Sequence, residues 1–166
     1  MIHDPQAAAW LVWLESSALA VAMRKWMWLY PGVEIVHITG IVALVGGAVL
    51  FDLRLLGLSR ALPVATLSRH LLPWSRVGLG LVAASGALMF TAHATEWAEN
   101  PVFRIKLVLI VLAGTNATIL HSATTGARAN RDIDPSALLS GRIAGGSSIV
   151  LWALVLLAGR WIGHLT

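Results

Sequence analysis

The amino-acid sequence predicts an all-α membrane protein: a transmembrane four-helix bundle with an additional N-terminal interfacial helix. The chain of 166 residues is 57% hydrophobic and only 12% charged, which is far too apolar for a soluble domain of this size. Four stretches contain no charged residue, namely 35–51, 77–95, 107–127 and 143–159. Each is about long enough to cross a bilayer core of roughly 30 Å at about 1.5 Å per residue.

The first segment, residues 5–30, is predicted to be an interfacial helix that lies against one membrane face. Pro5 is placed to start a helix, and Pro31-Gly32 is placed to end it. Tryptophan residues gather near the two ends of the segment, and Glu15 and Arg24 interrupt its apolar character. A fifth spanning helix over the same residues is the alternative interpretation.

The four spanning helices are expected within one integral membrane domain that covers residues 1–166. Their expected bounds are 33–57, 74–96, 102–127 and 138–162.

The boundaries of these spans follow from charged residues and prolines. The first span follows Pro31-Gly32 and ends near Asp52-Leu53-Arg54. Residues 57–73 contain two prolines and two arginines, and they are interpreted as a connection with a short surface helix. The turn Glu99-Asn100-Pro101 precedes the third span, and a polar turn at 130–135 separates it from the fourth.

The basic residues predict the orientation of the bundle. One face, with the 52–76 and 128–142 connections, has seven Lys or Arg residues, and the opposite face has five. The positive-inside rule places the richer face in the cytoplasm and both termini outside it. The expected location is the bacterial inner (cytoplasmic) membrane, with the lipid bilayer and not nucleic acid as partner, because the basic residues lie at segment ends.

The sequence contains no cysteine. Disulfides, thiolate-bound metals and covalently attached c-type haem are therefore excluded. Any metal or cofactor must be held by histidine, methionine, carboxylate or backbone groups.

Four histidines near the ends of the predicted spans are the candidate metal ligands. With alternating helix directions, His37 and His93 fall towards the outer face, whereas His70 and His121 fall towards the cytoplasmic face. Two imidazoles from separate helices at similar depth are what haem b requires, so the sequence predicts one or two haems. A structural role in hydrogen bonding between helices is the alternative interpretation of each histidine.

Two further kinds of residue fit a haem site. Arg24 and Arg104 at the outer face and Arg76 at the inner face are candidates to neutralise haem propionates. Gly86, seven residues before His93, is expected to leave room for a flat macrocycle.

The pattern resembles two groups of membrane proteins. Its architecture and histidine placement are similar to the four-helix di-haem cytochromes of the b561 type, a resemblance that implies haem ligation by paired histidines and transmembrane electron transfer. It also resembles short bacterial membrane proteins related to copper-resistance D-type domains. The motifs that carry this second resemblance span about half of the chain: Leu29-Tyr30-Pro31, Glu34-x2-His37-x2-Gly40, Phe51-Asp52-Leu53-Arg54-Leu55-Leu56-Gly57 and Asn100-Pro101-x-Phe103-x2-Lys106.

The leading functional prediction is a b-type haem cytochrome that moves electrons across or along the membrane. We expect an electron-transfer protein or oxidoreductase subunit more than a stand-alone enzyme. Its expected partners are a quinol or a periplasmic redox protein, with a quinone as a further candidate ligand and a homo-oligomer or respiratory complex as candidate assemblies. One alternative is a copper-handling protein that uses His37, Met89 and His93. The other is a structural anchor subunit of a respiratory complex.

Overall fold

The computed structural model describes residues 8–58, 61–126 and 135–162, and the side chains of all of these except 120–126 and 135–138. Within these ranges the chain forms seven helices and no strand, which confirms the all-α fold class. The helices are α1 (Ala9–Ser16), α2 (Ala18–Lys25), α3 (Leu29–Leu55), α4 (Val64–Ala92), α5 (Ala94–Glu99), α6 (Pro101–Gly126) and α7 (Pro135–Ile162).

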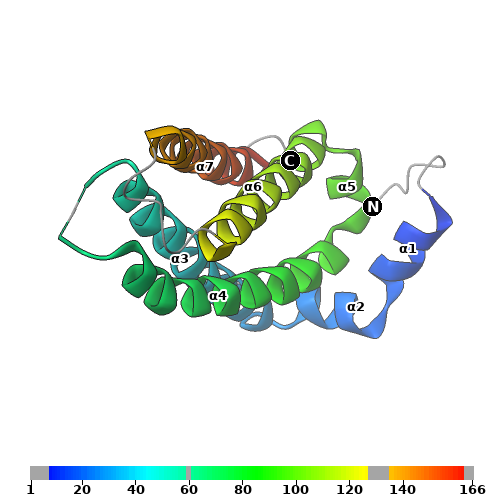
Figure 1. The fold of residues 1–166 in the computed structure, drawn as a ribbon. Coiled ribbons are helices and arrows are strands. Elements are labelled where there is room, and N and C mark those ends of the chain that lie inside the picture. The colour runs from blue at the N-terminus through cyan, green and yellow to red at the C-terminus, as the bar shows by residue number, and fades with distance from the viewer. Residues whose placement is uncertain (1–7, 59–60, 127–134, 163–166) are drawn as a thin grey trace.

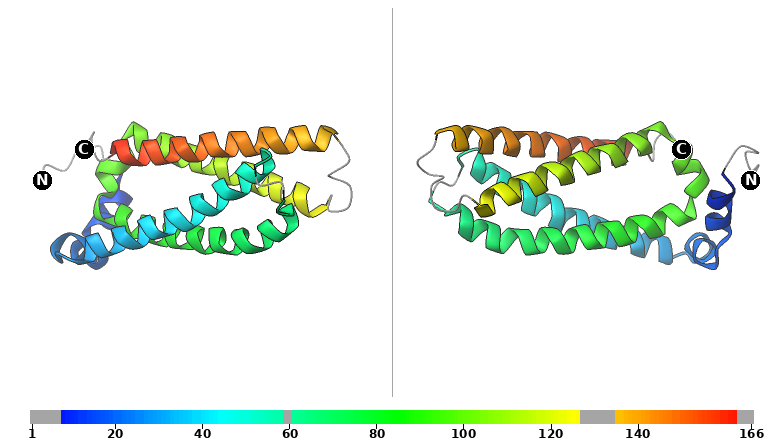
Figure 2. Two further views of the ribbon diagram at one scale, coloured as in Figure 1. Left: turned by 90° about the vertical axis from the view of Figure 1, so that its left-hand side faces the viewer. Right: turned by 45° about the vertical axis from the view of Figure 1, so that its right-hand side comes forward.

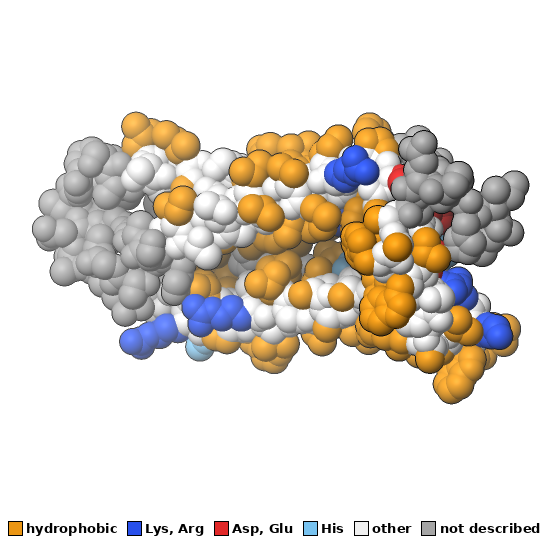
Figure 3. All heavy atoms as spheres, turned by 90° about the vertical axis from the view of Figure 1, so that its right-hand side faces the viewer, with side chains coloured by type: hydrophobic (Ala, Val, Ile, Leu, Met, Phe, Trp, Pro, Cys, Tyr) orange, Lys and Arg blue, Asp and Glu red, His pale blue; other side chains and the backbone are white. Residues whose placement is uncertain are grey.

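Helices α3, α4, α6 and α7 are long and apolar enough to cross a membrane. They run side by side along one direction, and α1 and α2 lie at one end of this bundle (Figures 1 and 2). On the face shown in Figure 3, apolar side chains cover the helices, and Lys and Arg side chains lie towards the two ends. This distribution is typical of a multi-pass membrane protein.

The N-terminal segment differs from the expected single helix over residues 5–30. It forms two helices of 8 residues each, and each is too short to span a bilayer. The break lies at Ser17, which has an extended backbone and whose hydroxyl accepts a hydrogen bond from the N–H of Ala20. Such an N-cap starts a new helix. Trp10, Trp13 and Trp26 are all exposed, as expected for a segment at a membrane interface.

Helix α4 starts ten residues before the expected boundary at Trp74, and this is the largest correction to the predicted spans. Pro63 directly precedes the helix, whereas Pro73 lies inside it. A proline removes only one intrahelical hydrogen bond, and helices that span membranes tolerate this loss when neighbouring groups compensate. At its other end α4 stops at Ala92, because His93 leaves the helical conformation with φ −140° and ψ 42°.

Helices α3 and α4 are antiparallel and form the tightest contact of the bundle. A Cβ atom placed on Gly78 would lie only 2.5 Å from the backbone N of Leu44 and 2.7 Å from the carbonyl O of Gly40. Farther along the same contact, a Cβ on Gly47, two turns after Gly40 on α3, would collide with the hydroxyl of Ser75, one turn before Gly78 on α4. Small residues at these positions let the two backbones come into direct contact, as is common between membrane helices.

The second helix pair, α6 and α7, joins the first through α7, which packs on α3. Leu44, Ala113, Trp152 and Val155 form a buried apolar cluster where these helices meet. In the described part of the chain, no Cα atom of α4 comes within 8 Å of one of α6. The two helices that flank α5 therefore do not pack closely against each other.

Three hydrogen bonds hold the N-terminal segment in place, and two of them attach α1 and α2 to the junction between α4 and α5. The guanidinium of Arg24 donates to the carbonyl O of Ala92 at 2.9 Å and to that of Glu15 at 2.7 Å. The Thr95 hydroxyl donates to the Glu15 carboxylate at 2.8 Å. The interfacial segment is thus attached to the bundle by polar contacts between parts far apart in the sequence.

Helix α6 begins with a side-chain cap that gives a first testable prediction. The Asn100 Oδ1 atom accepts hydrogen bonds from the N–H groups of Val102 at 2.9 Å and Phe103 at 3.4 Å. Replacing Asn100 with alanine should lower the free energy of unfolding by about 1 kcal/mol, because the helix loses the acceptor for these N–H groups. Thermal unfolding in detergent measures the effect. Asn100→Ser keeps an acceptor and should unfold within error of the wild type; equal loss in both variants would contradict the capping role.

Candidate cofactor site

His37 lies half-buried on α3, with its imidazole against α4. Its Nδ1 atom is 2.9 Å from the Ser85 hydroxyl oxygen. Because Ser85 donates its only O–H to the carbonyl of Leu81, the serine oxygen acts as acceptor for the histidine. Nδ1 therefore carries the proton in this arrangement, which leaves Nε2 as the unprotonated nitrogen of a neutral imidazole.

Gly86 provides the space in which the His37 ring sits. A Cβ on Gly86 would lie 3.1 Å from Cε1 and 3.6 Å from Nδ1 of His37, and no other atom comes within 4 Å. The Nδ1 and Cε1 edge of the ring thus faces α4, and Nε2 is turned away from it. The sequence predicted that Gly86 leaves room for a macrocycle; the structure instead fills this space with the His37 imidazole.

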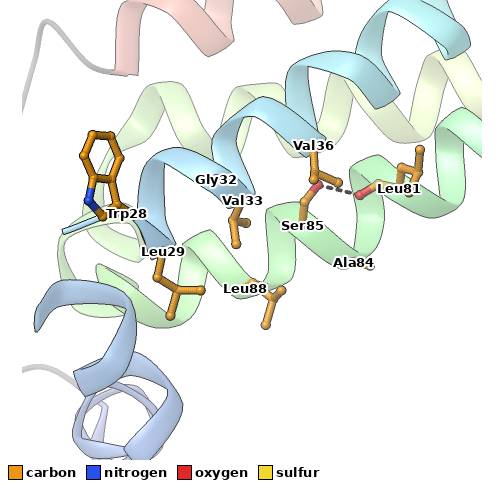
Figure 4. A pocket seen from close by; sticks show the side chains of 9 residues that line it. All are labelled: Trp28, Leu29, Gly32, Val33, Val36, Leu81, Ala84, Ser85 and Leu88. Atoms are coloured by element: carbon orange, nitrogen blue, oxygen red, sulfur yellow. Dashed lines mark hydrogen bonds between the residues drawn. The ribbon is translucent and has the colours of Figure 1, made fainter. Parts of the chain in front are cut away.

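Ser85 also reaches the outer surface of the α3–α4 pair. It lines an apolar groove of about 300 Å³ together with Val36, Leu81, Ala84 and Leu88 (Figure 4). The Ser85 side chain is itself 3% exposed. The His37–Ser85 pair therefore lies between the interior of the bundle and a groove on its outer surface.

His93 lies at the junction of α4 and α5, where it follows one helix and precedes the next. Its Nδ1 atom is 3.4 Å from the Glu96 carboxylate, and its side chain is 36% exposed. The ring stacks on Trp97 at 5.9 Å and meets Tyr30 edge to face at 6.0 Å. Trp97 and Phe90 in turn contact the ring of Phe103 on α6, so His93 belongs to an aromatic cluster.

The structure brings His37 and His93 to the same end of the bundle, though in separate surroundings. Tyr30, which contacts His93, precedes His37 by seven residues on α3, and seven residues correspond to about 10 Å along a helix. His37 is therefore about two turns deeper than His93, whereas the sequence analysis placed the two at similar depth.

A lysine provides the positive charge nearest to His37. Lys106 on α6 packs against α7, where its Nζ atom would lie 3.3 Å from a Cβ on Gly159. The charges of Lys106 and Glu34 both act on the His37 imidazole. The sequence suggests a headgroup anchor for Lys106, but its side chain is partly buried within the bundle.

The arginines predicted to neutralise haem propionates are either bound to backbone carbonyls or distant from His93. Arg24 is bound to the carbonyls of Ala92 and Glu15, and the Nε atom of Arg104 donates to the carbonyl of Ala98 at 2.8 Å. Arg76 is exposed on α4, one residue after Ser75, and thus lies on the half of that helix away from His93. Compared with these arginines, Lys106 is better placed to neutralise a propionate at the predicted outer haem site.

The predicted inner pair is not assembled in the described part of the chain. His70 lies within α4, not in a connection, and its side chain is exposed. His121 falls on α6, and its side chain lies outside the described residues. In the part of the chain that the structure describes, no three His, Asp or Glu side chains come together in a group that could hold a metal ion, so a copper site at His37, Met89 and His93 gains no additional ligand.

Ser85 and the aromatic neighbours of His93 were not assigned to the site from the sequence, whereas Lys106 was among the basic residues expected to neutralise propionates at the outer face. The signal for Ser85 was present, because a serine beside a glycine within a spanning segment indicates close helix contact. The inward direction of Lys106 depends on the rotation of α6, which its apolar sequence does not specify.

Comparison with known proteins identifies a family but not an activity. The sequence model described as "Family of unknown function (DUF6644)" matches residues 10–165. No curated protein and no solved structure matches the chain. The resemblance to b561-type and copper-resistance D-type proteins therefore remains a prediction.

Proposed function

Because the chain belongs to the DUF6644 family of unknown function, we propose its function from its own site: a membrane cytochrome that holds haem b through His37 and His93. Since the two imidazoles differ by about two turns in depth, this ligation requires the rings to approach each other when haem binds. The observation that carries this proposal is that an oxygen atom faces Nδ1 of each imidazole, from Ser85 and from Glu96. Histidines that bind metals commonly have the second ring nitrogen held in this way, so that Nε2 is oriented and made more basic.

The surrounding residues suit a haem in three respects. Lys106 supplies a positive charge inside the bundle, where the acidic propionates of a haem would need one. Phe90, Trp97 and Phe103 form an apolar aromatic wall next to His93. In the described part of the chain, α4 and α6 make no close backbone contact with each other. When bound, haem supplies one-electron transfer at a potential set by its ligands and its surroundings.

The protein's own groups would position and protect the cofactor. Ser85 fixes the proton on Nδ1 of His37, and Glu96 does the same for His93. We propose a single haem near the outer face, because His70 is exposed and offers no inner ligand pair with a described residue. The proposed location is the bacterial inner membrane, and the proposed electron partner is a quinol or a periplasmic redox protein.

An absorption spectrum of the purified, detergent-solubilised protein tests this proposal. The expected result is a Soret band with a sharp reduced α band typical of haem b with two imidazole ligands, at about one haem per chain. Protein that is folded by circular dichroism but colourless, and that stays colourless after incubation with haemin in lipid nanodiscs, would overturn the assignment. Copper without iron in elemental analysis would also overturn it and would favour the copper-handling alternative.

A structural membrane-anchor subunit is the second candidate function. The observation that favours it is the seating of His37 on Gly86 within the tightest helix contact, where an imidazole also serves packing. Under this function, His37→Gln would leave the assembly of a partner complex intact and no cofactor would be lost.

A further inference from the structure

The motif Phe51-Asp52-Leu53-Arg54 plays no part in the proposed haem site, yet it contains the most deeply buried acidic side chain of the described residues. Asp52 is 2% exposed and lies in the last turns of α3, about six turns from Tyr30. Burial of an ionisable side chain is costly unless it is paired or neutral, so the state of this carboxyl group requires an explanation.

Helix α7 encloses Asp52. A Cβ on Gly145 would lie 3.2 Å from the Asp52 carbonyl O and 3.6 Å from its Cα, so the two helices approach closely at this glycine. The Ser148 hydroxyl forms a hydrogen bond with the Asp52 carboxyl group. The other carboxyl oxygen, Oδ2, is buried and has no hydrogen-bond partner.

A second buried polar atom at the same α3–α7 contact also lacks a partner. The indole Nε1 of Trp152 is buried and unpaired, and Trp152 is four residues after Ser148 on the same side of α7. Buried polar groups without partners are rare in proteins, and each one requires an explanation such as a bound water or an exchangeable proton.

The charged groups near Asp52 do not neutralise a carboxylate. On α3, the Nε atom of Arg54 donates to the carbonyl of Leu62 at 2.6 Å. On α7, Arg142 is exposed, one turn before Gly145, and on α4 Arg76 is exposed as well. Among the described residues, no cationic side chain forms an ion pair with Asp52. An isolated carboxylate in such a place would carry a large solvation cost, whereas the neutral acid would not.

We propose that Asp52 is a proton-binding site: its carboxyl group, held by Ser148 at the contact between α3 and α7, takes up a proton as the pH falls below neutral. Binding adds one proton to a carboxyl oxygen, and release returns that proton to water and leaves a carboxylate. The unpaired Oδ2 is the atom that a water molecule would contact during this exchange. The site lies away from His37 and His93 and does not depend on haem.

Infrared spectroscopy of the full-length protein in lipid nanodiscs tests the proposal directly. At about pH 5 the wild type should show the carbonyl stretch of a protonated carboxylic acid, shifted to lower frequency in D2O, and the band should weaken as the pH is raised. Asp52→Asn should lose this band completely, whereas the matched control Glu34→Gln, a change at an exposed acidic residue, should retain it. Absence of the band from the wild type, or its persistence in Asp52→Asn, would overturn the proposal.

A second measurement keeps the proposal testable if Asp52→Asn fails to fold. Ser148→Ala removes the hydrogen bond but keeps the acid, so the band should stay and shift to higher frequency. Dicyclohexylcarbodiimide, an apolar reagent that reacts with protonated carboxyl groups, should label the wild-type peptide that contains Asp52, as detected by mass spectrometry. An unchanged band in Ser148→Ala, or labelling only of other acidic residues, would overturn the assignment.

Discussion

The substitution His37→Leu is expected to abolish haem binding, because it removes the ligand whose Nδ1 is held by Ser85 at 2.9 Å. His93→Leu should have the same effect. Ser85→Ala keeps both imidazoles and loses only the orienting hydrogen bond, so haem affinity should fall by about 10–100-fold. The haem content per chain, measured as the pyridine haemochrome after purification, checks all three results.

His70→Leu is the matched control, since it is the same substitution at an exposed histidine of another spanning helix. This variant should keep the full haem content and the wild-type spectrum. Undiminished haem in His37→Leu would remove this residue as a ligand, and equal loss in His70→Leu would show that the effect is on folding and not on ligation.

Gly78→Ala is expected to lower the free energy of unfolding by about 1–3 kcal/mol. We expect this to be the largest loss among single changes at the contact between α3 and α4. The added Cβ would lie 2.5 Å from the backbone N of Leu44 and 2.7 Å from the carbonyl O of Gly40. Backbone atoms cannot rotate away as a flexible side chain can, so the two helices must separate. Thermal unfolding in detergent, monitored by circular dichroism, measures the loss.

Gly80→Ala is the control for this prediction. Gly80 lies on the same helix, and a Cβ there would meet nothing within 4 Å. Alanine is favoured over glycine in a helix interior, so this variant should be equally stable or more stable by about 0.5–1 kcal/mol. If both alanine variants unfold alike, the close contact at Gly78 does not limit stability.

The positions of the four long helices could be predicted from the sequence because charged residues are absent over lengths that match a bilayer. The start of α4 could not, because Pro73 was interpreted as a boundary although the helix continues through it. The division of the N-terminal segment at Ser17 was missed for a related reason: an N-cap serine inside an apolar stretch gives only a weak signal.

The candidate site was predicted only in part. The grouping of His37 and His93 at one end follows from their positions in antiparallel helices, and the structure agrees with it. Their difference in depth and the partner atoms of each ring depend on the rotation and offset of α3 and α4. These are determined by the close packing at Gly40 and Gly78, which hydrophobic periodicity alone does not specify in an apolar helix.

The attachment of α1 and α2 has a mechanical consequence for His93. Arg24 is bound to the carbonyl of Ala92, and Glu15 is bound to Thr95, so these two attachments flank His93 in the sequence. The exposed tryptophans on α1 and directly after α2 prefer the headgroup region of a bilayer. A displacement of α1 and α2 relative to the bundle would therefore shift the backbone on both sides of His93. The position of the His93 imidazole is thereby linked to bilayer thickness and lipid composition.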